Sequence, residues 1–143
     1  MAGRGAIRAW MLLLPALTTM AGAACAGDVQ QGDDAPTGHW INPRRTVQVA
    51  TGNCRGNLCG WVIWASPEAI ADAQDAGVKD LLGTELLRSY HSTGKGRWQG
   101  EVYVPDMGRT FSSTMVQLDA NRLKISGCIL GGWLCKSQIW QRS

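Results

Sequence analysis

Apolar and polar residues alternate along much of the chain after residue 36, which is the pattern of half-buried β-strands. Val47 and Val49, for example, alternate with Thr46 and Gln48. Turn signals rich in Gly, Asn, Asp and Pro separate the alternating segments. The expected strands cover residues 37–41, 46–51, 58–65, 82–90, 98–104, 110–118, 123–127 and 134–142. Short connections between consecutive strands predict an antiparallel meander, which forms either a sandwich or a closed up-and-down barrel.

One segment has helical periodicity. Ser66 is a good N-cap, Pro67 suits the first helical position, and Gly77 is a natural stop. We expect a short amphipathic helix over 67–76. The preceding strand, 58–65, is apolar on both faces and should therefore be covered on both sides. The helix is expected to pack across the barrel wall or over one mouth.

The first 26 residues follow the order of a secretory signal peptide. Arg4 and Arg8 precede an apolar run from Ala9 to Leu17, and small residues follow up to Ala26. The run is shorter than the roughly 20 residues of a membrane-spanning helix. The sequence therefore predicts cleavage and a mature chain without a transmembrane segment. An uncleaved anchor is the alternative.

Cys25 allows a second interpretation of the same site, because it could be a lipid-attachment cysteine. Such sites want an aliphatic residue three positions upstream, where this chain has Gly22. Plain cleavage is therefore preferred, and a lipid anchor through Cys25 is the minor alternative. Residues 27–36 are polar and unpatterned, so a disordered leader is expected there, and residues 37–143 are expected to form the domain.

Charge excludes one class of partner. The full chain has 14 Lys and Arg against 11 Asp and Glu, and two of the arginines lie in residues 1–26. A nearly neutral domain has no electrostatic footprint for nucleic acid, whose binding depends on neutralising phosphates. We therefore expect no nucleic-acid partner.

Four of the five cysteines follow residue 26. An even number in an exported protein predicts disulfides. Each close pair brackets a turn, which favours Cys54–Cys59 and Cys128–Cys135, each worth about 2 kcal/mol. The rival interpretation is a four-cysteine zinc site, but such sites usually use Cys-x-x-Cys pairs and these spacings are wider. No metal is therefore expected.

Residues that could carry catalysis are few. His39 and His91 have no nucleophile motif nearby and are interpreted as surface residues. No Gly-x-Ser-x-Gly or Gly-rich phosphate loop occurs, so we expect neither an enzyme nor a cofactor. Glu85 and Glu101 alternate with apolar residues in strands. Inward-facing, either could orient a ligand or transfer a proton; outward-facing, they are solvated.

Six of the seven tryptophans lie after residue 26, and each combines a large apolar area with one N–H donor. Trp61 or Trp64, with Tyr103, is predicted to line a pocket for an apolar ligand, and Glu101 is its polar candidate. Trp133, at a Gly-Gly turn, is predicted to be an exposed contact residue at a barrel mouth. The tryptophans expected to fill the interior are Trp40, Trp98 and Trp140.

The order of short motifs resembles the family called domain of unknown function 2147, over roughly residues 37–142. The motifs are Gly38-x-Trp40, Cys54 with Leu58-Cys59-Gly60, Leu82-Gly83-Thr84, Trp98-x-Gly100-x-Val102-Tyr103-x-Pro105, and Gly127-Cys128 through Leu134-Cys135 to Trp140-x-Arg142. The chain departs from the family at 66–80, where a helical segment replaces a loop containing asparagine and proline.

The resemblance implies an all-β, calycin-like or lipocalin-like barrel of about eight strands in the bacterial envelope, and it implies no activity. In calycins an N-terminal Gly-x-Trp packs under an arginine near the C-terminus. Here Gly38 and Trp40 would meet Trp140 and Arg142 at the closed end. The stack of Trp40 with Arg142 would contribute ~0.5–2 kcal/mol.

The predicted function is binding of a small lipophilic molecule by a barrel in the periplasm or outside the cell. The alternative is a protein-interaction or inhibitor module that uses Trp133 and the loop Lys95-Gly96-Arg97.

Overall fold

The structure, a computed structural model, describes residues 35–143. The predicted signal peptide, the alternative lipid site at Cys25 and residues 27–34 of the predicted leader lie outside the described residues. Those interpretations stay predictions.

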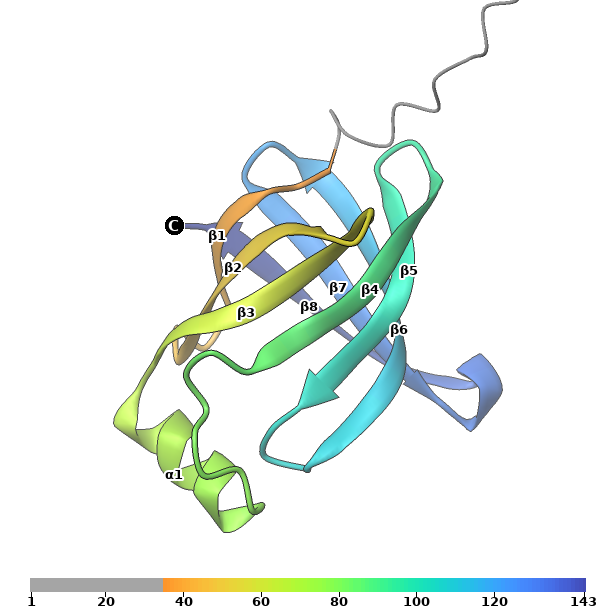
Figure 1. Cartoon of the computed structure of the whole chain (residues 1–143). Helices are drawn as coiled ribbons and strands as arrows, with labels where there is room; N and C mark the ends of the chain where they lie inside the picture. The colour runs from red at the N-terminus through yellow and green to blue at the C-terminus, as the bar shows by residue number, and fades with distance from the viewer. Residues whose placement is uncertain (1–34) are drawn as a thin grey trace, which may run out of the picture.

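The described chain forms a closed antiparallel barrel of eight strands (Figure 1). The strands are β1 (Gly38–Ile41), β2 (Val47–Cys54), β3 (Asn57–Ala65), β4 (Glu85–Gly94), β5 (Arg97–Val104), β6 (Arg109–Asp119), β7 (Arg122–Ile129) and β8 (Leu134–Arg142). Each strand pairs with the next, and β8 returns to β1 through Trp40↔Arg142 and Ile41↔Gln141. The predicted fold class is confirmed, and closure leaves no long unpaired edge.

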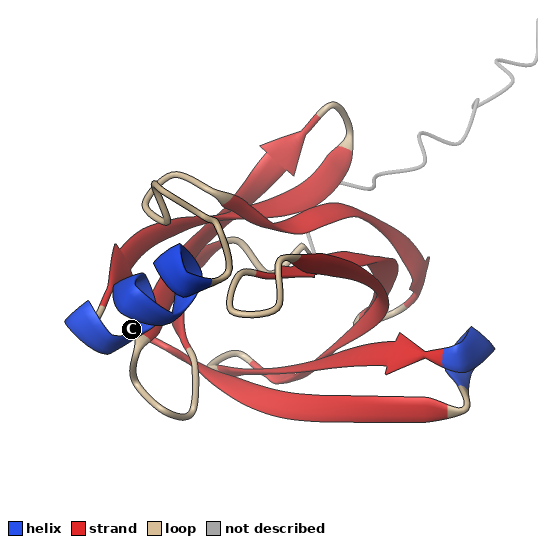
Figure 2. Cartoon of the chain, turned by 90° about the horizontal axis from the view of Figure 1, so that it is seen from below, coloured by secondary structure: helices blue, strands red, loops and turns tan. Residues whose placement is uncertain are grey.

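The helix α1 (Pro67–Asp75) lies between β3 and β4, as the sequence predicts. The Ser66 hydroxyl accepts a hydrogen bond from the backbone N–H of Ala69 at 3.2 Å, which caps the first turn. Figure 1 shows α1 at one end of the barrel, and Figure 2 shows the short 3-10 turn η1 (Leu130–Gly132), which lies between β7 and β8. Within the described part of the chain, neither helix has the length and apolar character of a membrane-spanning segment.

Large side chains fill the end of the barrel remote from α1. Tyr90 donates a hydrogen bond from its hydroxyl to Ser113 at 2.6 Å, so this buried polar pair is satisfied. Gly100 is needed beside it, because a Cβ there would come within 2.8 Å of the Tyr90 ring. Trp40, Met115 and Leu123 are fully buried at this end as well, whereas the buried side chain of Leu87 borders the cavity.

The two ends of the domain meet at this filled end. The Arg142 guanidinium lies 4.2 Å from the centre of the Trp40 ring. Its Nη1 donates to the Thr37 carbonyl at 3.0 Å and its Nε to the Ala120 carbonyl at 2.8 Å. Gly38 has φ +130°, and a Cβ at this position would collide with Nη1 of Arg142, so glycine is required. The arginine therefore ties the first and last strands of the barrel and the β6–β7 turn together.

Pro36, which the sequence predicts as the end of a disordered leader, is part of the packed structure. Pro36 is buried, and its carbonyl accepts hydrogen bonds from the Trp40 indole N–H at 3.2 Å and the Thr51 hydroxyl at 2.6 Å. Hydrogen bonds anchor Pro36, which composition alone does not reveal, so the ordered domain includes it.

Both predicted disulfides are confirmed. Cys54–Cys59 spans the β2–β3 turn with a Cα–Cα distance of 5.8 Å. Cys128–Cys135 joins opposite positions of β7 and β8, with a Cα–Cα distance of 4.0 Å. Each disulfide therefore staples one hairpin, as the spacings predict.

Candidate functional site

The half of the barrel next to α1 is hollow. A cavity of about 660 Å³ opens between α1, the β5–β6 turn and the β7–β8 hairpin. Its apolar inner wall consists of inward-facing strand residues, which include Leu86, Leu87, Val102, Phe111, Ile125 and Trp140. Two residues of this wall, Val102 and Gly127, have small side chains or none, and they leave space inside the barrel.

Charged side chains gather where the cavity opens. They are Arg44, Glu68, Asp72, Asp106, Arg109 and Lys136. All six residues are exposed. The cavity is thus apolar within and charged at its rim, an arrangement that suits a molecule with one apolar and one polar end.

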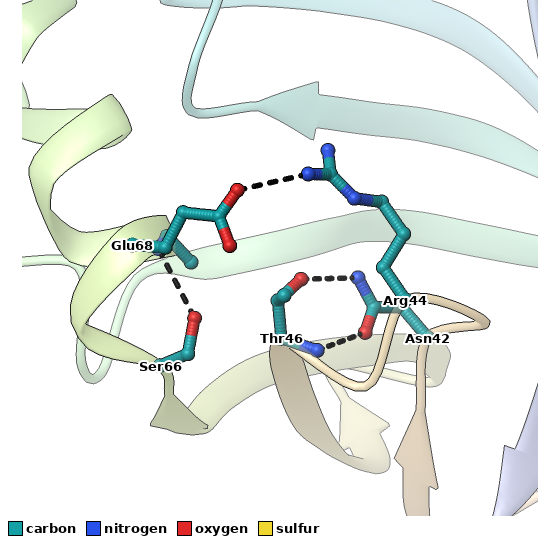
Figure 3. A network of polar contacts seen from close by, with 6 residues as sticks. Asn42, Arg44, Thr46, Ser66 and Glu68 are labelled. Carbon is teal, nitrogen blue, oxygen red and sulfur yellow. Dashed lines mark hydrogen bonds and ion pairs between the residues drawn. The ribbon is translucent and has the colours of Figure 1, made fainter.

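A polar network attaches α1 to the rim (Figure 3). Asn42 shapes the β1–β2 turn, because its side-chain oxygen accepts from the backbone N–H of Thr46 at 2.7 Å and of Val47 at 3.0 Å. The turn presents Arg44, whose Nη2 lies 3.0 Å from Oε1 of Glu68 in α1. Both side chains of this ion pair are more than half exposed, so it adds at most about 1 kcal/mol of stability. Its main consequence is to place opposite charges side by side at the mouth.

β8 contributes polar side chains that sequence reasoning missed. Lys136 and Gln138 line the cavity, and the Trp140 indole N–H donates to the Gln138 side-chain oxygen at 3.2 Å. The sequence does contain a signal for this position. Lys136 and Gln138 alternate with Ser137, so in a strand they lie on the same face as Trp140. Polar residues on the inward face of a strand indicate that the barrel is not filled there.

Trp61 and Trp64 do not line the cavity, contrary to the prediction. The inward residues of β3 are Leu58, Gly60 and Val62, and Trp61 points outward. Gln48 and Val49 pair with Trp64 and Val62, so a β-bulge at Ile63 shifts the alternation and leaves Trp64 45% exposed. The outer face of β3 is therefore not covered, because α1 lies at the mouth.

Tyr103 and Glu101 belong mainly to the outer face of β5. Tyr103 reaches the cavity rim, and the Arg88 guanidinium lies over its ring at 4.7 Å. Glu101 is exposed, pairs with Arg88 across the ladder and is absent from the cavity lining. Of the four predicted ligand residues, the structure brings only Tyr103 to the cavity.

The cysteine sulfurs of the first hairpin lie close to Glu85, within 4.8 Å. They are bonded to each other and do not offer thiolates to a metal.

In the barrel interior, burial raises the pKa of Tyr90 above its ordinary value, which keeps the phenol protonated as the donor to Ser113. The Tyr90 side chain lies outside the cavity lining and acts in packing.

Comparison with a solved structure supports the same fold. The chain is similar to protein HP1028 of Helicobacter pylori, a structure described as belonging to the lipocalin family. The TM-score is 0.57 and the sequence identity 14%, over 78% of this chain and 84% of the other. At this identity the likeness shows the fold alone. No curated protein sequence matches this chain.

Comparison with protein-family models gives the family. Residues 38–142 match the model called DUF2147, described as an uncharacterized protein conserved in bacteria. The match spans the barrel from the start of β1 to the end of β8. The chain therefore belongs to the DUF2147 family, with a lipocalin-like barrel as its fold.

Proposed function

We propose that the protein binds a small, largely apolar molecule in the cavity beside α1. The observation that carries this proposal is the cavity itself, whose volume of about 660 Å³ suits one small molecule. Eight-stranded barrels can enclose a single small ligand in this way. The likeness to a lipocalin-family structure supports the proposal by analogy.

The lining specifies the kind of ligand. An apolar portion would contact Leu87, Val102 and Trp140, while a polar group would stay at the rim near Arg44 and Lys136. Burying a polar group in the apolar wall without a partner would cost several kcal/mol, so this orientation is favoured over the reverse. The ligand we propose is therefore amphipathic, with its polar end toward solvent.

The same proposal places the protein outside the cytoplasm and describes it as a binder without catalysis. Two disulfides suit an oxidising compartment, and the N-terminal pattern is that of an export signal. Among the described residues, the cavity lining contains no histidine, cysteine or serine. The carboxylates of the lining, those of Glu68, Asp72 and Asp106, are exposed at the rim, which favours solvated surface groups over a catalytic pair.

Gly127 provides the test, because it lies in the cavity wall. A Cβ at this position would lie 3.3 Å from Val102 and 3.9 Å from Phe111, so a longer side chain would project into the space. Gly127→Leu should weaken binding of cis-parinaric acid, a fluorescent lipid probe, at least about tenfold, since it fills the apolar wall. Titration of probe fluorescence measures this.

Ser126→Leu is the matched control. Ser126 is the neighbouring residue on the outer face, where its hydroxyl lies 2.7 Å from that of Ser137. This variant should bind the probe as the parent protein does. Equal binding by the Gly127→Leu variant, or no binding by the parent protein, would contradict the proposal. Native mass spectrometry of protein purified from the cell envelope should additionally show a co-purifying small molecule.

A further inference from the structure

The β7–β8 hairpin projects from the side of the barrel (Figures 1 and 2). Large apolar side chains at its tip are exposed. Trp133 is 91% exposed and Leu130 75% exposed, and Leu134 and Ile129 beside them are 57% and 39% exposed. Four large apolar side chains gathered at one exposed turn indicate an interaction surface rather than scattered surface residues.

The hairpin is built to present this tip as a unit. The disulfide Cys128–Cys135 joins the two strands directly beneath the four apolar residues. Gly131 adopts a left-handed conformation with φ 65°, which allows the tight turn. A stapled turn loses less conformational entropy on binding than a free loop, because its geometry is set beforehand.

Charge differs between the hairpin tip and α1. No residue from 122 to 142 is acidic, and the cation beside the tip is Lys136, whereas Arg122, Lys124 and Arg142 lie toward the filled end of the barrel. Across the mouth, α1 carries the carboxylates of Glu68, Asp72 and Asp75. Figure 2 shows α1 and the hairpin tip on opposite sides of the barrel. A negatively charged surface is therefore favoured at the tip and disfavoured at α1.

We propose that the β7–β8 tip inserts into the interfacial layer of a lipid bilayer that contains anionic headgroups. Trp133 suits this layer, because its ring is apolar and its indole N–H can bond to water or headgroups. Leu130 would contact the upper part of the acyl chains. Lys136, which directly follows Cys135, lies at the base of the tip, where it can pair with phosphate oxygens.

A lipid surface fits the tip better than a groove on a protein. The turn from Ile129 to Cys135 carries no charge, and the indole N–H is its only strong side-chain hydrogen-bond donor. Protein interfaces usually surround an apolar centre with a polar rim that forms hydrogen bonds. Here the tip offers apolar side chains followed directly by one cation, Lys136, which is the order of groups from the interior to the surface of a bilayer.

The position of the tip also connects it with the cavity. Ile129 and Leu134 line the cavity as well as the tip, so insertion would bring the opening next to the membrane surface. A lipophilic molecule could then pass between bilayer and barrel with little exposure to water. This consequence rests on the proposed ligand-binding function; insertion of the tip does not.

Tryptophan quenching tests insertion at the tip itself. Protein purified from cells expressing the full-length sequence is mixed with vesicles of phosphatidylcholine and phosphatidylglycerol with brominated acyl chains. Bromine should quench part of the emission of the parent protein and of Trp64→Phe, a matched variant of a half-exposed tryptophan on β3. Trp133→Phe should lose that quenching, because it removes the inserted fluorophore. Quenching that persists unchanged in Trp133→Phe, or none in the parent, would overturn the proposal.

Vesicle flotation provides the second measurement. Leu130→Ser should lower the fraction of protein bound to the same vesicles about tenfold, whereas Leu82→Ser, at a 56% exposed site near α1, should leave it unchanged. Equal losses in both variants would overturn the proposal. So would a dimer that forms without vesicles and that Leu130→Ser abolishes, since the tip would then serve a second copy of the chain. Because probe binding in the cavity is measured without vesicles, failure of either proposal can be recognised separately.

Discussion

Arg142 is the single side chain with the widest set of contacts at the closed end. It stacks on Trp40 and donates to the Thr37 and Ala120 carbonyls. Arg142→Ala should therefore lower the free energy of unfolding by about 1.5–5 kcal/mol, which sums a cation–π contact and two hydrogen bonds. Urea denaturation at 25 °C measures this value.

Arg122→Ala is the matched control for that variant. Arg122 makes a surface ion pair with Asp119 at 2.7 Å, and both side chains are about half exposed. Exposed pairs of this kind contribute little, so the change should be within about 0.5 kcal/mol. A cost as large as that of Arg142→Ala would show that loss of any arginine near the β6–β7 turn destabilises the barrel.

Tyr90 makes stability depend on alkaline pH. Burial raises its pKa in the folded state above the ordinary value of 10.0. Above that pH the unfolded chain loses the phenolic proton while the folded protein keeps it, so the free energy of unfolding should fall by up to about 1.4 kcal/mol per pH unit. Urea denaturation between pH 9 and 11 should show this slope, and Tyr90→Phe should reduce it.

Tyr103→Phe serves as the comparison, since it removes the other tyrosine and keeps Tyr90. It should retain the alkaline slope of the parent protein. If Tyr90→Phe and the parent lose stability in parallel above pH 10, the buried phenol is not the source of the pH dependence.

At the scale of elements, alternation predicted the strands well and their inward faces less well. The strand at 82–90 begins later in the structure, as β4 at Glu85, because Leu82 to Thr84 form a turn. In β3 both faces are apolar, so composition could not indicate the inward one. The bulge at Ile63 determines which residues face the interior, because it turns Ala65 inward and Trp64 outward. Pairing irregularities of this kind depend on the neighbouring strand, which a local pattern does not contain.

The second disulfide should stabilise its own hairpin. Replacing Cys128 and Cys135 by alanine should lower the free energy of unfolding by about 2 kcal/mol, because the unfolded chain gains freedom. Hydrogen exchange should accelerate at the β7–β8 tip while the rest of the barrel changes little. The double variant Cys54→Ala and Cys59→Ala should lose similar stability without faster exchange at that tip. Acceleration throughout the barrel would contradict a local role.

At the scale of the whole molecule, the barrel has a filled half and a hollow half. Trp40 and Met115 occupy the filled half, whereas Val102 and Gly127 stand at the level of the cavity. The sequence predicted a barrel and its closure from motifs at its two ends. It could not predict the cavity, because the space left inside depends on how far side chains from all strands reach toward one axis.

Backbone pairing between β1 and β8 closes the barrel, in addition to the side-chain contacts of Arg142. β1 and β8 pair at only two positions, so removing residues 141–143 should eliminate this seam and expose two strand edges. Exposed edges promote association between chains. The truncated protein should elute earlier than the parent in size-exclusion chromatography and unfold at lower urea concentration. Arg142→Ala keeps the backbone pairing and should elute with the parent. If the truncated chain also elutes with the parent and unfolds at the same urea concentration, an open eight-stranded sheet suffices and the β1–β8 pairing contributes little to the fold.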